Sequence, residues 1–469
     1  MKIIRAIICC FLAVSSIADA QPQQGVLFTN VMVWDGTSEA LRKADVLVTG
    51  NKISEVSDEP LAVIQSTDMT VIDGGGRTLM PGLIDAHVHL NMQFGGHATD
   101  RGIQGMQNLT WEEIGALAYE SAREFLPAGV TTVRDLCGMS QGLRKHIDSG
   151  VLEGPRIYTS GACISQTSGH GDWRTDSEAL RRDGSKSNLE LLGVAWLADG
   201  ADDVLKAARN NLAAGADFAK MMSGGGVTSE RDPIESIQGT MAELEAIVTA
   251  TGQFGTVAAV HAYHDTSVQN AITAGVMSIE HGNLMEDPDT FKMVAKAGGW
   301  IVPAMAAFAP DILEHPYYGN PALPAYAKTA RIQKNGEKWV ELANRFKVNL
   351  GFGSDVIIVT KEVWRPARDF QITQWGRAFG NYRTLKAMTS DNGRLMALTG
   401  VMNPYPHGKL GVIEEGAYAD IILVDGNPLE DLSAIGAVPS MFGSTPRPTP
   451  SVDTIRLVMK DGKVYKNTL

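Results

Sequence analysis

The sequence predicts an α/β protein built around a closed (β/α)8 barrel. The first observation is a repeat in which a helix-like stretch ends in a small residue and glycine, and a short β-rich run follows. The second is the number of parallel strands, because eight can be traced along the chain, which favours a closed barrel over an open doubly wound sheet. The third is length, since 469 residues exceed the roughly 250 to 300 that one hydrophobic core usually supports. A second, smaller domain or long insertions are therefore expected as well.

The repeat defines five of the predicted strands. Glycine is expected just past a helix C-terminus, where φ is positive, and runs of Val, Ile, Thr and Phe suit buried parallel strands. These strands follow Gly129, Gly215, Gly255, Gly275 and Gly298, and they cover residues 130–135, 216–220, 256–261, 276–281 and 299–303. Strands near His87, in 156–162 and in 348–354 complete the set. A Rossmann-like sheet is the alternative, but no G-x-G-x-x-G follows a strand and opens a helix.

Residues 1–20 have the pattern of a cleaved signal peptide. Lys2 and Arg5 precede an apolar core at 7–14, which is too short to span a bilayer, and Ala-Asp-Ala at 18–20 forms a small-x-small cleavage site. We therefore expect an exported protein, periplasmic or secreted. A retained membrane anchor is the alternative.

The mature chain is acidic and contains two cysteines. The formal net charge of the whole chain is -12, and removal of the signal peptide, which carries +1, gives -12 - 1 = -13. No cluster of Lys and Arg is present, which disfavours nucleic acid and anionic membranes as partners. Cys9 and Cys10 lie within the apolar core of the signal, so no lipid attachment is predicted. Cys137 and Cys163 could form one disulfide or remain buried thiols.

The most informative local motif is His-x-His near the end of a predicted strand. After the turn at Pro81 and Gly82, an apolar run leads into His87-Val88-His89. Residues two apart in a strand share a face, so His87 and His89 would point toward one metal ion. Two incidental histidines in a strand are the alternative.

Further polar residues fall at the ends of the predicted strands, and barrel active sites lie at the C-terminal ends of strands. The six with metal-binding or related chemistry are His87, His89, Lys220, His261, His281 and Asp355. Neutral imidazole and carboxylate suit zinc or a similar borderline metal, and a set of this size indicates two divalent ions. Ammonium cannot ligate a cation. Lys220 must therefore be deprotonated or chemically converted, or else it is a salt-bridging structural residue.

The motifs together resemble the amidohydrolase superfamily. The segments that carry this resemblance are Leu83–His89, Gly215–Lys220, Ser278–Gly282 and Gly353–Asp355. The segments Ser165–Asp172 and Val260–Tyr263 resemble its imidazolonepropionase-like branch, which includes metal-dependent prolidases of the Xaa-Pro dipeptidase type. The resemblance covers almost the whole mature chain.

This resemblance implies a binuclear metal centre with Zn2+ as the expected ion. His87 and His89 would bind the more buried ion, and His261 and His281 would hold the second. Lys220 would be carbamylated by carbon dioxide and would bridge both ions. The carbamate accounts for a lysine among metal ligands, because it presents an anionic carboxylate-like group.

Three residues are implied to act on the substrate. Asp355 would ligate the first ion and pass a proton from the attacking water to the leaving nitrogen, as a carboxylate within reach of both can do. His170 would polarise the scissile carbonyl, and Tyr263 would hold the substrate's carboxylate. A structural loop histidine and ordinary barrel packing are the alternatives for these two residues. The two ions would lower the pKa of a bridging water and stabilise the oxyanion.

The same resemblance implies a small β-sandwich formed by both chain ends. Strands are predicted at 26–33, 45–56, 419–424 and 454–464, the last with the hairpin signal Lys-Asp-Gly-Lys at 460–463. The expected division is a signal peptide at 1–20, the first part of the sandwich at 21–79, the hydrolase barrel at 80–400 and the second part of the sandwich at 401–469.

Several loops and histidines lie outside these patterns. Residues 165–199 and 308–328 would follow barrel strands and could cover the mouth, where long loops are usually functional. Residues 433–451 are rich in Pro, Ser and Gly and indicate a surface loop. The segment 223–226 could cradle an anion, although a flexible barrel loop is the simpler interpretation. The histidines expected to be structural or at the surface are His97, His146, His264, His315 and His407.

The sequence thus predicts an exported metal-dependent hydrolase that cleaves the amide bond of dipeptides or N-acyl amino acids with a free carboxylate. A mononuclear deaminase would lack Lys220 and usually carries a glutamate near the third histidine, which 261–264 does not offer. A non-catalytic relative would be expected to have lost ligands, and none of the six is missing. Hydrolysis of bulky N-acyl amino acids such as ochratoxin-like amides, or of a cyclic amide as in imidazolonepropionase, are the alternatives. The expected partners are a small-molecule or dipeptide substrate and further copies of the chain in a homo-oligomer, without nucleic acid or a stable membrane anchor.

Overall fold

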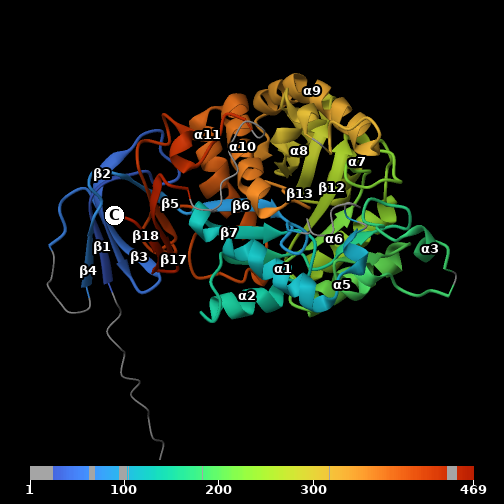
Figure 1. Cartoon of the computed structure of the whole chain (residues 1–469), viewed down its shortest axis with the longest axis horizontal. Coiled ribbons are helices and arrows are strands. Elements are labelled where there is room, and N and C mark those ends of the chain that lie inside the picture. Colours follow the sequence, from blue (N-terminus) through green and yellow to red (C-terminus); the bar gives the residue numbers. More distant parts are fainter. Residues whose placement is uncertain are drawn as a thin grey trace, which may run out of the picture.

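A computed structural model of the chain consists of a barrel flanked by a smaller domain of strands from both chain ends (Figure 1). It describes residues 25–62, 69–94, 103, 105–181, 183–315, 317–440 and 452–469. The predicted signal peptide, residues 1–20, lies outside the described residues, and so does His97. Within the described residues, no helix is long and apolar enough to cross a membrane.

The barrel strands run parallel and follow one another in chain order. One ladder contains β6 (Leu83–Val88), β7 (Val130–Asp135) and β8 (Arg156–Thr159). The other contains β11 (Ala219–Met222), β12 (Ala258–His264), β13 (Ser278–Leu284), β14 (Trp300–Val302) and β15 (Asn349–Leu350). Backbone hydrogen bonds join the two ladders on both sides, from Asp217 N to Thr159 O at 2.8 Å and from Ala86 N to Phe352 O at 2.9 Å. The predicted α/β barrel is confirmed, and each of its eight strands overlaps one of the predicted segments.

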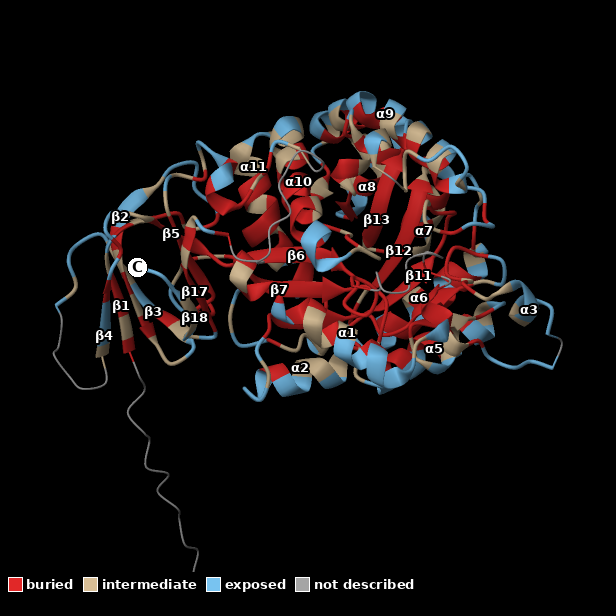
Figure 2. Cartoon of the chain, viewed as in Figure 1, coloured by how far each residue is buried: buried red, intermediate tan, exposed pale blue. Residues whose placement is uncertain are grey.

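Helices cover the outside of the barrel, with buried strands inside and exposed helical faces outside (Figure 2). Their ends follow the expected signals: Thr110 and Thr240 form capping boxes with Glu113 and Glu243, and the five glycines of the repeat all have positive φ. The helices longer than one turn are α1 (Trp111–Arg123), α2 (Gln141–Asp148), α5 (Ala201–Ala213), α6 (Met241–Gln253), α7 (Asp265–Ala274), α8 (Pro288–Ala297), α9 (Pro324–Phe346), α10 (Lys361–Phe379), α11 (Asn381–Lys386) and α12 (Asn392–Ala397).

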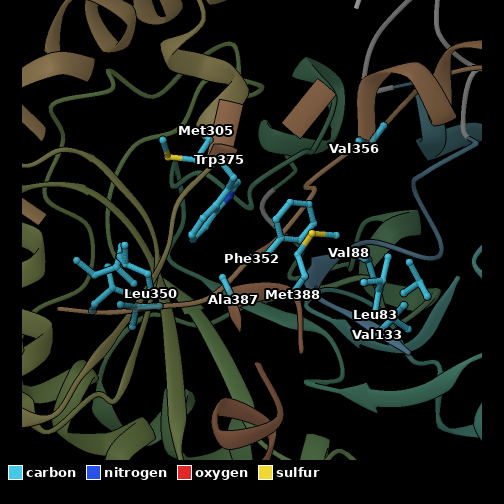
Figure 3. Close-up of a cluster of buried hydrophobic side chains, with 14 of the residues drawn as sticks. Leu83, Val88, Val133, Met305, Leu350, Phe352, Val356, Trp375, Ala387 and Met388 are labelled. Atoms are coloured by element: carbon cyan, nitrogen blue, oxygen red, sulfur yellow. The ribbon is translucent and has the colours of Figure 1, made fainter. Parts of the chain in front are cut away.

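The main hydrophobic core lies between the barrel strands and these helices. Figure 3 shows part of it, with Leu83, Val88 and Val133 on one side and Phe352 and Trp375 on the other. The rings of Phe352 and Trp375 lie 5.9 Å apart. This packing fixes the chain just after β15, because Phe352 is fully buried there.

The two chain ends form one eight-stranded sheet around a separate hydrophobic cluster. The strands from the N-terminal part are β1 (Gly25–Val33), β2 (Arg42–Thr49), β3 (Lys52–Ser57), β4 (Met69–Asp73) and β5 (Thr78–Pro81). Those from the C-terminal part are β16 (Ile421–Val424), β17 (Ile455–Lys460) and β18 (Lys463–Asn467). Strand β5 pairs with β16 and so joins the ends, as expected. The segment 45–56, however, is a hairpin of β2 and β3 rather than one strand, because Gly50 has a φ of 60° and reverses the chain.

The segments expected as long loops contain short elements. Strands β9 (Cys163–Ser165) and β10 (Ala195–Leu197) extend the second barrel ladder beyond β11, and helices α3 (Asp176–Ala179) and α4 (Asn188–Leu191) lie between them. These elements have three or four residues each, too short for a periodic hydrophobic pattern to reveal them. Residues 305–308 and 312–314 form single 3-10 turns before α9. Of the loop predicted at 433–451, residues 441–451 lie outside the described residues.

A buried ion-pair cluster connects the barrel to the sheet of the chain ends. The Arg156 guanidinium on β8 donates to Asp420 at 2.8 and 3.2 Å and to Asp461 at 2.6 Å. The side chains of Arg156 and Asp420 are each only 4% exposed. Removing one partner of a buried pair leaves an uncompensated charge, which is strongly destabilising.

We therefore expect Asp420→Ala to lower the free energy of unfolding by about 3–5 kcal/mol. The matched control is Asp425→Ala, since Asp425 pairs with Arg77 but is 42% exposed, and we expect a loss of about 1 kcal/mol or less. Denaturant unfolding of both variants provides the measurement. Equal losses in the two variants would contradict a special role for the Arg156 cluster.

Candidate active site

The residues singled out from the sequence converge at the C-terminal ends of the barrel strands. They are His87 on β6, His89 just after it, Lys220 on β11, His261 and Tyr263 on β12, His281 on β13, Asp355 after β15 and His170 in the loop after β9. All of these except His87 line one pocket, and His87 lies directly behind His89 and Asp355.

The imidazoles and Asp355 are close enough to share metal ions. His87 Nε2 lies 3.2 Å from His89 Nε2, and the two nitrogens lie 3.4 and 3.3 Å from Asp355 Oδ1. His281 Nδ1 lies 3.8 Å from Asp355 Oδ2. Each of three residues offers one ligand atom, and these three atoms lie within 4.8 Å of one another: the residues are His87, His281 and Asp355. The ring of His261 lies 4.5 Å from that of His281.

The backbone brings these groups together by the expected alternation and by two unusual turns. His87 and His89 share a face, as residues two apart in a strand should. His281 and Asp355 have φ values of 75° and 48°, a region that costs a non-glycine residue about 1–3 kcal/mol and is concentrated at functional sites. The positive φ of His281 interrupts the strand alternation, so that Glu280 and His281 can both reach the site.

The charge states of the site suit a divalent cation. Burial holds the pKa values of His87, His261 and His281 well below the ordinary value, so these imidazoles are neutral. Burial opposes ionisation of Asp355, but the neighbouring His87 and His89 outweigh it and lower its pKa. The buried Nδ1 of His281 has no hydrogen-bond partner among the described residues. Three neutral imidazoles, one carboxylate and an unsatisfied ring nitrogen fit a metal of the zinc type.

Lys220 is buried among these histidines with 1% of its surface exposed. No hydrogen bond or ion pair of its ammonium is found within the described part of the chain, and its positive charge lowers the pKa of His87, His261 and His281. An isolated buried ammonium is costly. A salt-bridging structural role for Lys220 therefore has no support in the geometry, whereas a chemically converted lysine would fit it.

The two candidate substrate residues pack directly against candidate metal ligands. The His170 ring stacks on His261 with centroids 4.1 Å apart, and the Tyr263 ring stacks on His281 at 4.9 Å. Burial lowers the pKa of His170 to about 3, so its ring is neutral. Burial also raises the pKa of Tyr263 well above its ordinary value, so its hydroxyl remains a hydrogen-bond donor.

Two pockets adjoin at the barrel mouth, and we call them the inner and the outer chamber. The inner chamber, about 270 Å³, holds the site, and its remaining wall is mostly apolar, with residues such as Met92, Trp173, Val227, Ile332 and Ile357. Among the described residues that line it, Asp355 is the only carboxylate. The outer chamber, about 730 Å³, is lined mostly by polar residue types and shares Ile103, Trp173, Thr228 and Tyr317 with the inner one.

Comparison with known proteins agrees with this site. The profile of the amidohydrolase family matches residues 78–465. The chain belongs to the amidohydrolase family. It is therefore a hydrolase that acts on amide bonds, and members of this family are generally metal-dependent.

Individual relatives of this amidohydrolase cover nearly its full length. Ochratoxinase of Aspergillus niger is 27% identical over 418 residues, which are 87% of this chain and 82% of the relative. A solved prolidase complexed with N-methylphosphonate-L-proline is 28% identical with a TM-score of 0.78, over 94% of this chain and 100% of the other. A solved Xaa-Pro dipeptidase with bound methionine in its active site is 26% identical with a TM-score of 0.76, over the same shares of the two chains.

Some residues of the site were not assigned by sequence reasoning. Glu280 supports His87, and Lys328 holds a loop beside His170. His315, expected to be structural or at the surface, lines the inner chamber together with Tyr317 and Tyr318. Alternation in a strand would have placed Glu280 on the face opposite His281. The segment 308–328 was expected to cover the mouth, but nothing in its sequence indicated which of its side chains line the chamber. Cys137 and Cys163 are buried free thiols, so the disulfide alternative does not hold.

Glu280 orients His87 from behind. Its Oε2 lies 2.9 Å from His87 Nδ1, while its Oε1 accepts from Arg134 Nη2 at 2.6 Å and from Ser278 Oγ at 2.8 Å. A metal-ligating histidine usually bonds a carboxylate or carbonyl with its second nitrogen, which fixes the ring and its tautomer.

We therefore expect Glu280→Gln to weaken metal affinity by about 10- to 100-fold. Resistance of the metal content to graded chelator measures this effect, with circular dichroism to show that the barrel remains folded. The exposed Glu286 on the same side of the barrel provides the control, and Glu286→Gln should behave as the wild type. Unchanged chelator resistance in Glu280→Gln would rule out its support of His87.

Proposed function

We propose that this chain is an exported, binuclear metal-dependent amidohydrolase that cleaves the amide bond of dipeptides or N-acyl amino acids with a free carboxylate. The observation that carries the proposal is the convergence of four imidazoles, one carboxylate and an unpaired buried lysine at one barrel mouth. The likeness to a prolidase solved with a phosphonate of proline, to a dipeptidase and to ochratoxinase supports the same type of substrate.

In this proposal His87, His89 and Asp355 would hold one divalent ion, and His261 and His281 would hold the other. Lys220, carbamylated by carbon dioxide, would be shared between them, which would account for the missing partner of its ammonium. Zinc is the expected metal because neutral imidazoles and carboxylates are its usual ligands. When bound, such ions lower the pKa of water and polarise an amide carbonyl.

The chain's own residues then position the substrate and move the proton. Asp355 accepts the proton of the attacking water and delivers it to the leaving nitrogen, and no other described carboxylate lines the inner chamber. The neutral ring of His170 donates a hydrogen bond to the scissile carbonyl. The hydroxyl of Tyr263 donates to the carboxylate of the substrate.

A second candidate substrate class is that of bulky N-acyl amino acids of the ochratoxin type. It is favoured by the apolar wall of the inner chamber, by the adjoining outer chamber and by the resemblance to ochratoxinase. A small cyclic amide, as in imidazolonepropionase, would leave much of this space unused. Export and a homo-oligomeric state remain parts of the proposal, and they rest on residues 1–20 and on the family likeness.

The deciding experiment assays the mature protein with added zinc against dipeptides, N-acyl amino acids and cyclic amides. We expect kcat/KM to be highest for substrates with a free carboxylate, and amidation of that carboxylate should lower it. Activity restricted to cyclic amides, or indifferent to the carboxylate, would overturn the proposed substrate class.

Loss of Lys220 should remove metal and activity together. In Lys220→Ala we expect metal content to fall from about two divalent ions per chain, the number that a bridged binuclear zinc site holds, with activity falling in parallel. Short carboxylic acids added with metal should restore a small part of the activity. Full activity and metal content in Lys220→Ala would show that the lysine is not a bridging ligand.

Asp355→Asn tests the proton shuttle apart from the scaffold. The amide keeps the size of the side chain but cannot accept a proton, so kcat should fall by about 10²- to 10⁴-fold with a smaller change in KM. Metal analysis of the same sample must show both ions, since Asp355 is also a candidate ligand. A variant that keeps its metal and near-wild-type kcat would assign the base role to another group.

A further inference from the structure

The outer chamber has charged side chains in its wall that the proposed catalytic groups do not use. Of the described residues that line it, four are carboxylates and two are guanidinium groups, namely Asp172, Asp176, Glu230, Asp232, Arg174 and Arg231. The wall therefore has more negative than positive charge. A cleft lined by an excess of one sign of charge attracts ligands of the opposite sign.

Both guanidinium groups are already paired with carboxylates of the same wall. Arg174 donates to the two oxygens of Asp172 at 2.7 and 2.6 Å. Arg231 donates to Asp176 and, at 2.9 Å, to the carbonyl of Arg174. Neither cation is therefore left over for an anionic ligand, and the carboxylates that remain are those of Glu230 and Asp232.

Asp232 is buried in the loop 226–232 and is 3% exposed. Its Oδ2 accepts from the N–H of Gly226 at 3.0 Å and from Gln238 Nε2 at 3.1 Å, while its Oδ1 has no hydrogen-bond partner among the described residues. Lys328 lies behind the loop, where its Nζ donates to the carbonyls of Gly226, Ser229 and Asp232 at 2.7, 2.7 and 2.8 Å and its charge attracts Asp232. This lysine holds the loop and offsets the charge of Asp232, so that the unbalanced charge of the wall is that of Glu230.

Glu230 lies where the two chambers meet. It is exposed, and the described part of the chain offers its carboxylate neither a hydrogen bond nor an ion pair. Burial raises the pKa of Tyr317 and the charge of Glu230 adds to this effect, so the two side chains are close to each other. Tyr317 and Thr228 belong to the walls of both chambers. A group that extends from the inner into the outer chamber therefore passes beside Glu230.

Two of the four residues shared by the chambers are aromatic, Trp173 and Tyr317. The stem of a lysine or arginine side chain packs against apolar surface while its charged head stays in polar surroundings, and aromatic rings attract cations to their faces. An apolar and aromatic passage that leads to an unpaired carboxylate thus suits a long basic side chain better than a neutral or acidic one.

The outer chamber adjoins the acyl side of the proposed substrate. In the proposed function His170 contacts the scissile carbonyl, and Tyr263 contacts the carboxylate of the leaving amino acid. Ser229 and Gly169 line the outer chamber, and Ser229 Oγ lies 2.7 Å from His170 Nδ1. Tyr263 lines the inner chamber only. A side chain that reaches the outer chamber therefore belongs to the residue that supplies the scissile carbonyl.

We propose that the outer chamber binds a basic side chain on the acyl side of the scissile bond, and that Glu230 is the carboxylate that receives its charge. The proposal rests on the proposed amide hydrolysis and names its substrate class more closely. The preferred substrates are dipeptides whose first residue is lysine or arginine.

A set of three dipeptides with the same C-terminal residue tests this preference in the metal-loaded protein. Their first residues are lysine, norleucine, which keeps the four-carbon stem without the charge, and glutamate. We expect kcat/KM for the lysine dipeptide to exceed that for the norleucine dipeptide by about 5- to 10-fold, between the contributions of an exposed ion pair and of a charged hydrogen bond. The glutamate dipeptide should be the poorest substrate. Equal kcat/KM for lysine and norleucine would overturn the proposal.

Variants of Glu230 assign the preference to this residue. Glu230→Gln should remove most of the preference for lysine over norleucine, and Glu230→Arg should favour glutamate over lysine. The matched control is Glu235→Gln, because Glu235 pairs with Arg331 and is not among the described residues that line either chamber. This control should keep the wild-type ratio. An equal fall for lysine and norleucine in Glu230→Gln would indicate contact with the α-ammonium that both substrates share, and would overturn the assignment to the side chain.

A binding measurement separates this proposal from the proposed function. Analogues of the lysine and norleucine dipeptides, with a methylene group in place of the amide nitrogen, cannot be cleaved, and their affinity for the metal-loaded protein can be measured by calorimetry. We expect the lysine analogue to bind more tightly in the wild type and in Glu235→Gln but not in Glu230→Gln. This pattern in a protein that cleaves no dipeptide would overturn only the proposed function. Equal affinities in a protein that does cleave dipeptides would overturn only the role of Glu230.

Discussion

The burial of ionisable side chains at one end of the barrel is the constraint on which the site depends. Because parallel strands end at the same edge, the chain collects His87, His261 and His281 at the barrel mouth, where each residue is at most 4% exposed. Burial keeps these imidazoles neutral, and neutral imidazoles are the form that binds a divalent cation. The same burial makes the isolated ammonium of Lys220 unfavourable, which supports the carbamate proposed for this residue.

This arrangement is maintained by charged groups behind the site rather than by the site residues themselves. Glu280 lies against His87 and is balanced by Arg134, so a buried carboxylate is kept beside the imidazole without an unpaired charge. Lys328 plays a comparable part for the loop beside His170. In both cases one charged side chain forms hydrogen bonds with several groups at once. The low dielectric of the interior strengthens these hydrogen bonds and makes an unpaired group costly.

The shape of the pocket is determined by segments inserted after the barrel strands. The loop after β9 supplies His170 and Trp173, and the segment before α9 supplies Tyr317. The barrel is closed without these segments, so its geometry does not constrain their length. The division into an apolar inner chamber and a polar outer one therefore governs which amide fits, while the chemistry at the strand ends stays the same.

Much of the fold and the candidate metal centre could be predicted from the sequence. The glycine-terminated repeat gave the barrel strands because a positive φ after a helix and a buried parallel strand each have a local signature. The His-x-His motif also has a local signature, because His87 and His89 are two residues apart and so lie on the same face of a strand. The short strands β9 and β10 and the support of His87 by Glu280 could not be predicted, because they depend on three-residue pairings and on the strained φ of His281. The hairpin at 45–56 did have a local signal, since Gly50-Asn51 is a two-residue turn of the kind that joins hairpin strands. Lys328 and His170 are far apart in the chain, and only tertiary packing brings them to one site. The buried charge of Lys328 is stabilised there by three carbonyls of a loop that is distant in the sequence.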